Sequence, residues 1–365
     1  MTMMSDRKPL LLLQYGRGLA ALAVAAFHLS LLLGDPRYLG VPVFYDLTWR
    51  GNLGVDFFFV LSGFIIFYAH ERDIGRPERL KSYFAKRFTR LYPVYWVYVS
   101  AMCILLALNF GSATSFPQAV TDWLSTLLLV RFDSFELPIT PAWSLMHEVT
   151  FYALFGLLIM SRRIGWPLLA LWMVTILIAG SYSEEGHRTA FSTYFSAFNL
   201  DFAIGIAAFY ASKRCGSRLA VPAIVAGVLV LAGWYILETH GIVYRLHPLG
   251  YAACFGLIVA GLASFERERN LRPIAILKLL GDASYSIYLT HLAFLGVACK
   301  VAMVAMRFVP LPPAAVYVVV LAAAIIGGCL AHLLVEKPVL SFIRRKDSRR
   351  EIYLPTGEIR STHAG

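Results

Sequence analysis

LLLQYGRGLAALAVAAFHLSLLLG, at residues 11–34, establishes what kind of protein this is. A helix over this segment is apolar and long enough to cross a bilayer, which takes about 20 such residues. It nevertheless contains two ionisable side chains, Arg17 and His28. They are about three helical turns apart, so they share one face at a separation of about 16 Å. Because a charge facing lipid is costly, we expect this face to look into a helix bundle or a wet cavity.

The composition of the whole chain agrees with this first segment. Of its 365 residues, 58% are hydrophobic and 15% are charged, and the mean hydropathy is +0.65. A soluble protein with so few charges would leave too much apolar surface in water. We predict an all-α polytopic membrane protein with about ten transmembrane helices. The candidate spans are 10–33, 51–70, 88–108, 143–160, 166–181, 194–212, 219–237, 247–264, 284–306 and 313–335.

Lysine and arginine are concentrated in alternate loops along the chain. The opposite loops hold isolated arginines such as Arg37 and Arg50. Cytoplasmic loops carry the excess of positive charge in membrane proteins, which places both termini in the cytoplasm. The net charge of +11 therefore reflects membrane topology, and no nucleic-acid partner is predicted. The basic loops lie around 72–87, 162–163, 213–218, 267–278 and 344–346.

The apolar pattern divides the chain into three parts. These are a short cytoplasmic N-terminus at 1–9, a membrane domain at 10–338 and a basic, flexible cytoplasmic tail at 339–365. The longest external connection, 109–142, contains a half-apolar segment at 116–135 that is too short to span, which favours a re-entrant or interfacial helix. The five cysteines show no metal-ligand spacing, so no metal site is predicted.

Polar side chains near the outer ends of three predicted spans lie at similar depths. His28 is near the outer end of the first span, and Asp56 is about 7 Å into the second. Glu148 lies about two turns below the start of the fourth span, and Ser144 shares its face. A carboxylate level with His28 would orient or charge its imidazole. Alternatively, each carboxylate is a buried hydrogen-bonding group that holds helices together.

A second polar group gathers at the cytoplasmic side. Arg87 and Arg90 share one face at the entrance of the third span, and Arg17 is at a comparable depth. Tyr288 and His291 lie near the cytoplasmic start of the ninth span. Guanidinium groups bind phosphate through paired hydrogen bonds, so this mouth suits a phosphate-bearing ligand. Alternatively, Arg17 snorkels to the interface, and the other two arginines only fix the topology.

At these residues the sequence resembles the acyltransferase 3 family of integral membrane acyltransferases, and especially its exopolysaccharide O-acetyltransferase branch. The family pattern of a basic residue, ten residues and a histidine is met by Arg17 and His28. Further matches, in family order, are GVDFFFVLSGF at 54–64, RFTRLYP at 87–93, AWSLMHE at 142–148, SYSIYLTH at 284–291 and VEKP at 335–338.

The resemblance implies a fold, a reaction and a location. It implies ten helices in the bacterial inner membrane that transfer an acyl group from cytoplasmic acyl-CoA, often acetyl-CoA, to a hydroxyl of a surface carbohydrate. Acyl-CoA is then a co-substrate, and no permanently bound cofactor is expected. The expected partners are acyl-CoA, a polysaccharide or lipid-linked glycan, and membrane lipid.

Roles for individual residues follow from this resemblance together with their depths. Our hypothesis makes His28 the general base and Asp56 the carboxylate that orients it, with Glu148 as a second candidate partner or as a ligand of the acceptor hydroxyl. The acyl-CoA-binding candidates are Arg17, Arg87, Arg90, Tyr288 and His291, and the acceptor or channel candidates are Trp143, Ser144, Asn199 and Asp201. Asn199 and Asp201 would also be explained by helix packing.

Other mechanisms and functions remain open at this stage. His28 could carry the acyl group covalently, which would give ping-pong kinetics. A transporter or flippase of lipid-linked glycan would also bury charges along a polar path. A sensor or scaffold would tolerate the loss of His28. Consumption of acyl-CoA separates the enzyme from both of these classes.

Overall fold

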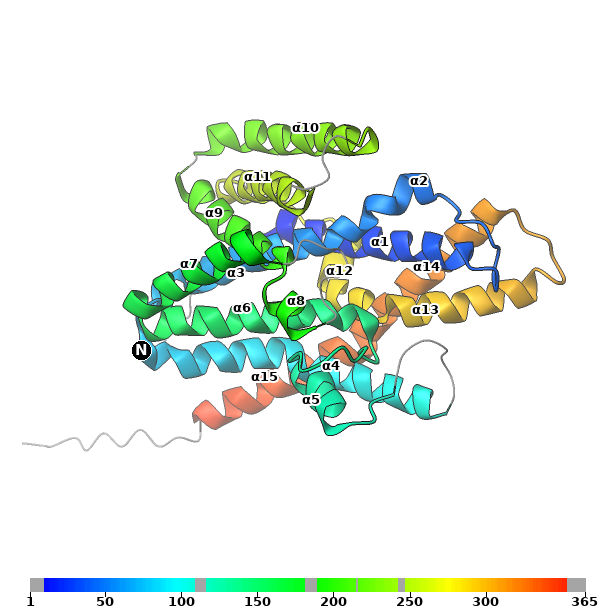
Figure 1. The fold of residues 1–365 in the computed structure, drawn as a ribbon, viewed down its shortest axis with the longest axis horizontal. Helices are drawn as coiled ribbons and strands as arrows, with labels where there is room; N and C mark the ends of the chain where they lie inside the picture. Colours follow the sequence, from blue (N-terminus) through cyan, green and yellow to red (C-terminus); the bar gives the residue numbers. More distant parts are fainter. Residues whose placement is uncertain (1–9, 109–115, 181–188, 215, 242–246, 353–365) are drawn as a thin grey trace, which may run out of the picture.

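The computed structural model describes residues 10–108, 116–180, 189–214, 216–241 and 247–352, and the regular elements in these ranges are helical (Figure 1). The bounds are α1 Leu11–Gly34, α2 Tyr45–Thr48, η1 Trp49–Leu53, α3 Gly54–His70, η2 Glu71–Asp73, η3 Pro77–Arg79, α4 Leu80–Ala107, α5 Val120–Leu128, η4 Thr140–Ala142, α6 Trp143–Met160, α7 Arg162–Ala179, α8 Ala190–Tyr194, η5 Ala197–Asn199, α9 Leu200–Arg214, η6 Ser217–Leu219, α10 Ala220–Thr239, α11 His247–Arg267, α12 Ala275–Asp282, α13 Ser284–Ala305, α14 Pro313–Ala331, η7 His332–Glu336 and α15 Lys337–Ile352.

The long helices run along the long axis of the molecule and alternate in direction (Figure 1). We refer to the end formed by residues 71–79, 161–163 and 216–219, drawn on the left, as the basic end. The end formed by residues 35–53 and 306–312, drawn on the right, is the opposite end. Helices α1, α13 and α14 reach further toward the opposite end than α3, α4 and α6 do (Figure 1).

Nine helices of the described part are long and apolar enough to cross a membrane, which agrees with an all-α polytopic membrane protein. The predicted span at 194–212 corresponds to α9, a helix of 15 residues. Such a helix is about 22 Å long, less than the roughly 30 Å of a hydrocarbon core. The short helices α8 and η5 precede it, and they take up residues that the sequence assigned to the span.

Helix α9 is an interior element that packs closely on α3. A Cβ atom added at Gly205 would lie 2.0 Å from the Val60 carbonyl oxygen, and one added at Gly63 would lie 2.3 Å from the Phe202 carbonyl oxygen. Small residues therefore allow the two backbones to touch, as is common between membrane helices. The rings of Phe202 and Phe151 stack beside this crossing with centroids 4.4 Å apart.

Two segments near the ends of the bundle differ from the sequence prediction. The tail was expected to be loose from residue 339, but it continues from α14 through the π-helical turn η7 into α15, as far as Ile352. The remaining tail, 353–365, and the N-terminal segment 1–9 lie outside the described residues. Helix α12 was not predicted, and its Gly281 packs on α1, where an added Cβ atom would lie 2.3 Å from the Gln14 carbonyl oxygen. This contact brings α12 and the start of α13 beside Arg17.

The predicted short helix in the external connection is present as α5, a helix of nine residues. Its last carbonyl groups accept hydrogen bonds from three side chains of α4. Tyr95 donates to the Thr126 carbonyl at 2.7 Å, Trp96 donates to the Leu127 carbonyl at 2.9 Å, and Tyr92 donates to the Leu128 carbonyl at 2.7 Å. Helix ends leave such carbonyls unpaired, so these bonds fix α5 against α4. Its depth in the membrane stays a prediction.

Candidate active site

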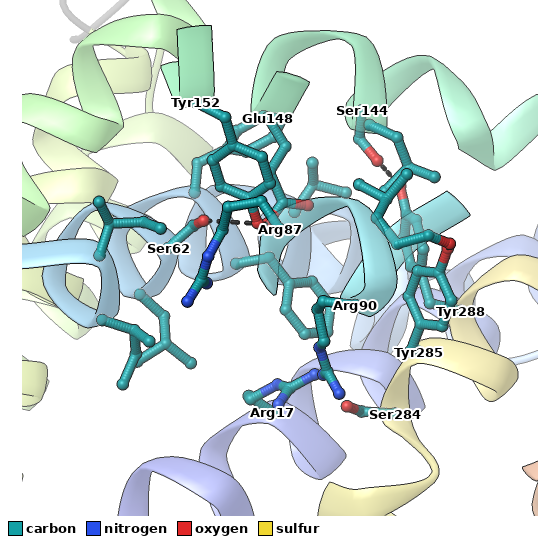
Figure 2. Close-up of a pocket in the computed structure, with 18 residues that line it drawn as sticks. Arg17, Ser62, Arg87, Arg90, Ser144, Glu148, Tyr152, Ser284, Tyr285 and Tyr288 are labelled. Carbon is teal, nitrogen blue, oxygen red and sulfur yellow. Dashed lines mark hydrogen bonds between the residues drawn. The ribbon is translucent and has the colours of Figure 1, made fainter. Parts of the chain in front are cut away.

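Two cavities that meet lie between the helices that carry most of the predicted site residues. The inner chamber, of about 150 Å³, is enclosed by α1, α3, α4, α6 and α13 (Figure 2). The basic cleft, of about 1080 Å³, opens at the basic end. Arg17, Leu61, Ile65 and Arg90 line both cavities. The polar lining of the inner chamber comprises Arg17, Ser62, Arg87, Arg90, Ser144, Glu148, Tyr152, Ser284, Tyr285 and Tyr288.

Arg17 and Arg90 stand at the junction of the two cavities. Figure 2 shows both guanidinium groups reaching into the same part of the chamber, beside Ser284. Arg17 Nη1 donates to Gln14 Oε1 at 3.4 Å. Within the described ranges, no carboxylate forms a salt bridge with either arginine. Two positive charges held together in a half-buried place favour an anionic ligand between them.

Arg87 is oriented by two residues that the sequence patterns did not bring out. Its Nη2 donates to His70 Nε2 at 3.1 Å, and His70 Nδ1 lies 2.8 Å from Asp73 Oδ2. Because a guanidinium group only donates, His70 Nε2 accepts and the Nδ1–H donates to the carboxylate. The i, i+3 spacing of His70 and Asp73 in HERD is the signal that could have revealed this pair.

Glu148 projects into the inner chamber from α6. Its Oε1 accepts a hydrogen bond from Ser62 Oγ of α3 at 3.0 Å and another from the hydroxyl of Tyr152, one turn further along α6 (Figure 2). The ring of Tyr152 lies 5.8 Å from the guanidinium carbon of Arg87. Glu148 is thus fixed in a wall of the chamber, together with an aromatic ring and a positive charge.

Ser144 and Tyr288 join α6 to α13 at another wall of the chamber. The Tyr288 hydroxyl donates to Ser144 Oγ at 2.9 Å, and Ser144 Oγ donates to the Pro141 carbonyl at 3.0 Å. Figure 2 shows this link at a distance from the arginine junction. Both side chains are buried, so they present hydroxyl groups to the chamber in fixed positions.

His28 lies beside His291. The two ring centroids are 4.9 Å apart, and His291 Nε2 is 3.3 Å from His28 Nδ1. His28 Nδ1 is also 2.8 Å from the Val24 carbonyl, and His291 Nδ1 is 2.6 Å from the Tyr288 carbonyl. We expected His291 in the donor channel, but the described lining of the two cavities includes Tyr288, one turn earlier, and does not include His291.

The register of α3 on α1 places Asp56 deeper than the sequence suggested. Gly54 packs on α1 at Ala20, where an added Cβ atom would lie 2.6 Å from the Ala20 carbonyl oxygen. Asp56 is two residues further along α3, whereas His28 is about two turns further along α1 in the other direction, so Asp56 lies roughly 10 Å below the level of His28. Helix α1 extends beyond the start of α3, so equal distances from the two helix ends do not mean equal depths. Asp56 is buried, and its role as a partner of His28 stays a prediction.

The remaining acceptor candidates lie among α6, α8 and α9 and do not line the chamber in the described part of the chain. Asn199 Oδ1 is 3.0 Å from His147 Nδ1, and the Asn199 amide donates to the Thr193 carbonyl at 3.0 Å. The ring of Trp143 packs against the ring of His147 with centroids 5.5 Å apart. Asp201 is fully buried. The described residues contain no group of three His, Cys, Asp or Glu side chains that could hold a metal ion.

A further polar network surrounds the π-helical turn η7. Glu336 is buried, and its Oε2 accepts from Ser286 Oγ at 2.6 Å and lies 2.9 Å from His332 Nδ1. The hydroxyl groups of Tyr98 and Ser286 are 2.7 Å apart. The network ties α4 and α13 to η7. The VEKP motif contains Glu336 and was the signal available in the sequence.

Comparisons with known proteins agree with this architecture. Residues 11–333 match the family model of an acyltransferase domain, Acyl_transf_3. The chain is 30% identical over 315 residues to the exopolysaccharide production protein ExoZ of Rhizobium meliloti, which covers 82% of this chain and 92% of that protein. It is 27% identical over 368 residues to the acyltransferase MdmB of Streptomyces mycarofaciens, with 90% and 91% covered.

A third relative is longer than this chain. The peptidoglycan O-acetyltransferase OatA of Listeria monocytogenes is 26% identical over 315 residues, which cover 75% of this chain and 47% of that protein. No solved structure matches the chain significantly. Because the family model spans nearly all of the described bundle, this multi-pass membrane protein belongs to the acyltransferase 3 family.

Proposed function

We propose that this protein transfers an acyl group, most simply acetyl, from acyl-CoA at the cytoplasmic side of the bacterial inner membrane to a hydroxyl of an exported carbohydrate. The observation that carries the proposal is an ordered series of groups along the bundle. The basic cleft meets the inner chamber at Arg17 and Arg90, and Tyr288 leads from the chamber to His291 and His28. The names of the relatives ExoZ and OatA support a carbohydrate acceptor.

The two cavities fit the two parts of acyl-CoA. The basic cleft is wide, and its cationic lining exceeds its acidic lining of Glu266 and Asp282. Besides the junction arginines it carries Arg72, Lys213, Arg267, Arg269 and Lys278, although Lys213 pairs with Glu71 and Lys278 with Asp282. This excess suits the charged nucleotide end. The inner chamber is narrow, which suits the pantetheine arm and its thioester. Arg17 and Arg90 would bind phosphate groups where the ligand passes from one cavity to the other. Arg87 would bind the same ligand from the chamber wall.

The hydrogen bonds of His28 support its use as a general base. A carbonyl oxygen only accepts, so His28 Nδ1 carries a proton that it donates to Val24, and Nε2 keeps its lone pair. By the same reasoning His291 Nδ1–H donates to the Tyr288 carbonyl, which leaves His291 Nε2 as an acceptor facing His28 Nδ1–H. His291 would therefore stabilise the imidazolium form of His28 during catalysis.

The reaction then proceeds in two proton transfers. His28 Nε2 removes the proton of the acceptor hydroxyl as that oxygen attacks the thioester carbonyl carbon. The C–S bond breaks, the new ester forms, and the departing thiolate of CoA takes the proton from His28. The Tyr288 O–H donates to Ser144 Oγ and the Ser144 O–H donates to the Pro141 carbonyl, and these two groups would polarise the thioester carbonyl by turning toward it in the chamber.

The test is acetyl-CoA turnover by the purified protein in nanodiscs, scored as free-thiol release with and without bacterial glycan. His28→Asn, which keeps polarity and size but removes the base, should lower acceptor-stimulated release by about 100-fold or more. Binding of acetyl-CoA and the melting temperature should stay close to wild type. Equal release by both proteins would overturn the role of His28. Glycan binding without any thiol release by wild type would favour a transporter or scaffold.

A further inference from the structure

A cluster of aromatic and charged side chains lies at the opposite end, away from both cavities. It consists of Trp49 and Arg50 of η1, Tyr235 and Glu238 of α10, and Tyr251 of α11. The Trp49 indole N–H donates to the Tyr235 hydroxyl at 3.1 Å, and the two ring centroids are 5.7 Å apart with planes at 49°. Figure 1 shows α2, which leads directly into η1, beside the end of α10. We refer to Trp49 and Tyr235 as the ring platform.

The ring platform is braced by a largely buried ion pair. Arg50 Nε donates to Glu238 Oε2 at 2.8 Å, and Tyr251 donates to the same carboxylate oxygen at 2.6 Å. The side chains of Arg50 and Glu238 are 15% and 12% exposed. The Arg50 guanidinium carbon also lies 3.9 Å from the centre of the Trp49 ring. The charges therefore neutralise each other beneath the surface and hold the rings in place.

The exposed surface of the ring platform is aromatic and uncharged. Tyr235 is 36% exposed, and Trp49 is half-buried. Aromatic rings with a polar edge suit a ligand that has an apolar face and hydrogen-bonding groups around it. A pyranose ring has this character, because its C–H bonds form an apolar face and its hydroxyl groups lie at the rim. A strongly charged ligand would gain little from an already paired Arg50 and Glu238.

The ring platform is anchored to the part of α1 that carries His28. On one side of Trp49, the Thr48 and Ser30 hydroxyls are 2.7 Å apart. On the other side, Gly51 touches the backbone of α1, where an added Cβ atom would lie 2.2 Å from the Ala23 carbonyl oxygen. Along η1, Trp49 lies between the two contact residues Thr48 and Gly51. Along α1, His28 lies between their partners, Ser30 and Ala23. The platform and the base therefore lie at the same level of the bundle.

We propose that Trp49 and Tyr235 form a carbohydrate subsite that stacks a sugar ring of the acceptor next to the sugar that is acylated. This inference rests on the proposed function, because it assigns the acceptor to the opposite end. The subsite holds the glycan chain while a neighbouring hydroxyl reaches His28. Its effect is on acceptor binding, and the chemistry at the thioester does not depend on it.

The competing explanation is that the two rings anchor the bundle at the membrane interface, where Trp and Tyr are frequent. Substitution by leucine separates the two roles. Leucine keeps apolar bulk at the interface but offers no flat ring for stacking. Tyr235→Phe is the matched control, because it keeps the ring and removes only the hydroxyl that accepts from Trp49.

The experiment measures thiol release from acetyl-CoA in nanodiscs with a panel of chemically de-O-acetylated bacterial exopolysaccharides and peptidoglycan fragments as acceptors. Trp49→Leu and Tyr235→Leu should each raise KM for the best acceptor by about tenfold, equivalent to about 1.4 kcal/mol. KM for acetyl-CoA and acceptor-independent hydrolysis should not change, and Tyr235→Phe should stay within about threefold of wild type. An unchanged acceptor KM in both leucine variants would overturn the subsite.

Direct binding separates failure of the subsite from failure of the proposed function. The same glycans are titrated into the protein without acetyl-CoA, and binding is followed by calorimetry. Acyl transfer by wild type together with equal glycan binding by Trp49→Leu would refute the platform alone. Glycan binding that the leucine variants lose, in a protein without acyl transfer, would refute the enzyme and retain the platform. A lowered melting temperature with unchanged glycan binding would assign the rings to membrane anchoring.

Discussion

Replacing His291 by asparagine tests whether it stabilises the charged form of His28. The Nδ1–H of His28 has two acceptors, the Val24 carbonyl at 2.8 Å and His291 Nε2 at 3.3 Å. A hydrogen bond to a charged group contributes about 1.5–3 kcal/mol. The bond to His291 is the longer of the two, and the carbonyl remains in the variant, so we expect a loss near 1.5 kcal/mol. His291→Asn should therefore lower kcat by about tenfold.

The assay compares four proteins in a double-mutant cycle: wild type, His28→Asn, His291→Asn and the double variant. Acceptor-stimulated thiol release gives kcat and KM for each. Because His291 acts through the imidazole of His28, its loss should have no further effect once His28 is replaced. KM for acetyl-CoA should change little in His291→Asn, since the side chain contacts His28 and Tyr288 and does not line the basic cleft among the described residues.

Two results would refute this reasoning. If His291→Asn is as inactive as His28→Asn while remaining folded, His291 is itself a base or an acyl carrier, and the assigned tautomers are wrong. If the fold-losses in kcat of the two single variants multiply in the double variant, the two residues act independently. A raised KM for acetyl-CoA in His291→Asn would support the original prediction that His291 binds the donor.

Three further predictions concern the donor, the chamber and the fold. Arg17→Gln should raise KM for acetyl-CoA by about 10- to 100-fold, because one charge-assisted hydrogen bond to phosphate is lost. Arg17→Lys keeps the charge and should raise KM less. A KM for acetyl-CoA equal to that of wild type in both variants would exclude the junction as a phosphate site. Tyr288→Phe should lower kcat by about tenfold and leave acceptor KM unchanged, which steady-state kinetics will check. Gly205→Ala should lower the free energy of unfolding by about 1–3 kcal/mol or more, and the melting temperature with it, because its Cβ atom would meet the Val60 carbonyl oxygen at 2.0 Å. Gly233→Ala is the matched control and should leave the melting temperature unchanged, because a Cβ atom there would meet nothing within 4 Å.

The membrane-spanning character of the chain could be predicted because it depends on local composition. An apolar segment such as residues 11–34 must form its backbone hydrogen bonds internally when it lies in lipid, so a helix is the available structure. Most helix positions followed directly: the prediction for 143–160 coincides with α6, and that for 284–306 differs from α13 by one residue. The bounds of α9 could not be predicted, because this helix is an interior element whose ends depend on packing against α3.

Depth along each helix could be counted from the sequence, but the register between helices could not. Counting placed Asp56 level with His28, whereas the close contact of Gly54 with α1 sets α3 deeper. Counting placed Arg17 and Arg90 at one depth, and the cavities show that they also share a junction. The spacing of residues along a helix is the same whichever helix packs against it, so this spacing does not determine which helices are neighbours.

The sequence alone was enough to establish a polytopic helical membrane protein, the helix face shared by Arg17 and His28, and the resemblance to a family of acyltransferases. Tertiary packing decided that His28 lies against His291, that His70 and Asp73 orient Arg87, and that Trp49 meets Tyr235 across 186 residues of sequence. The physical reason is the distance along the sequence between the residues that interact. Hydrophobic segments and helical turns are set by neighbours within a few residues, whereas a site is made by side chains from different helices, and close contacts such as Gly63 on Phe202 fix their relative positions.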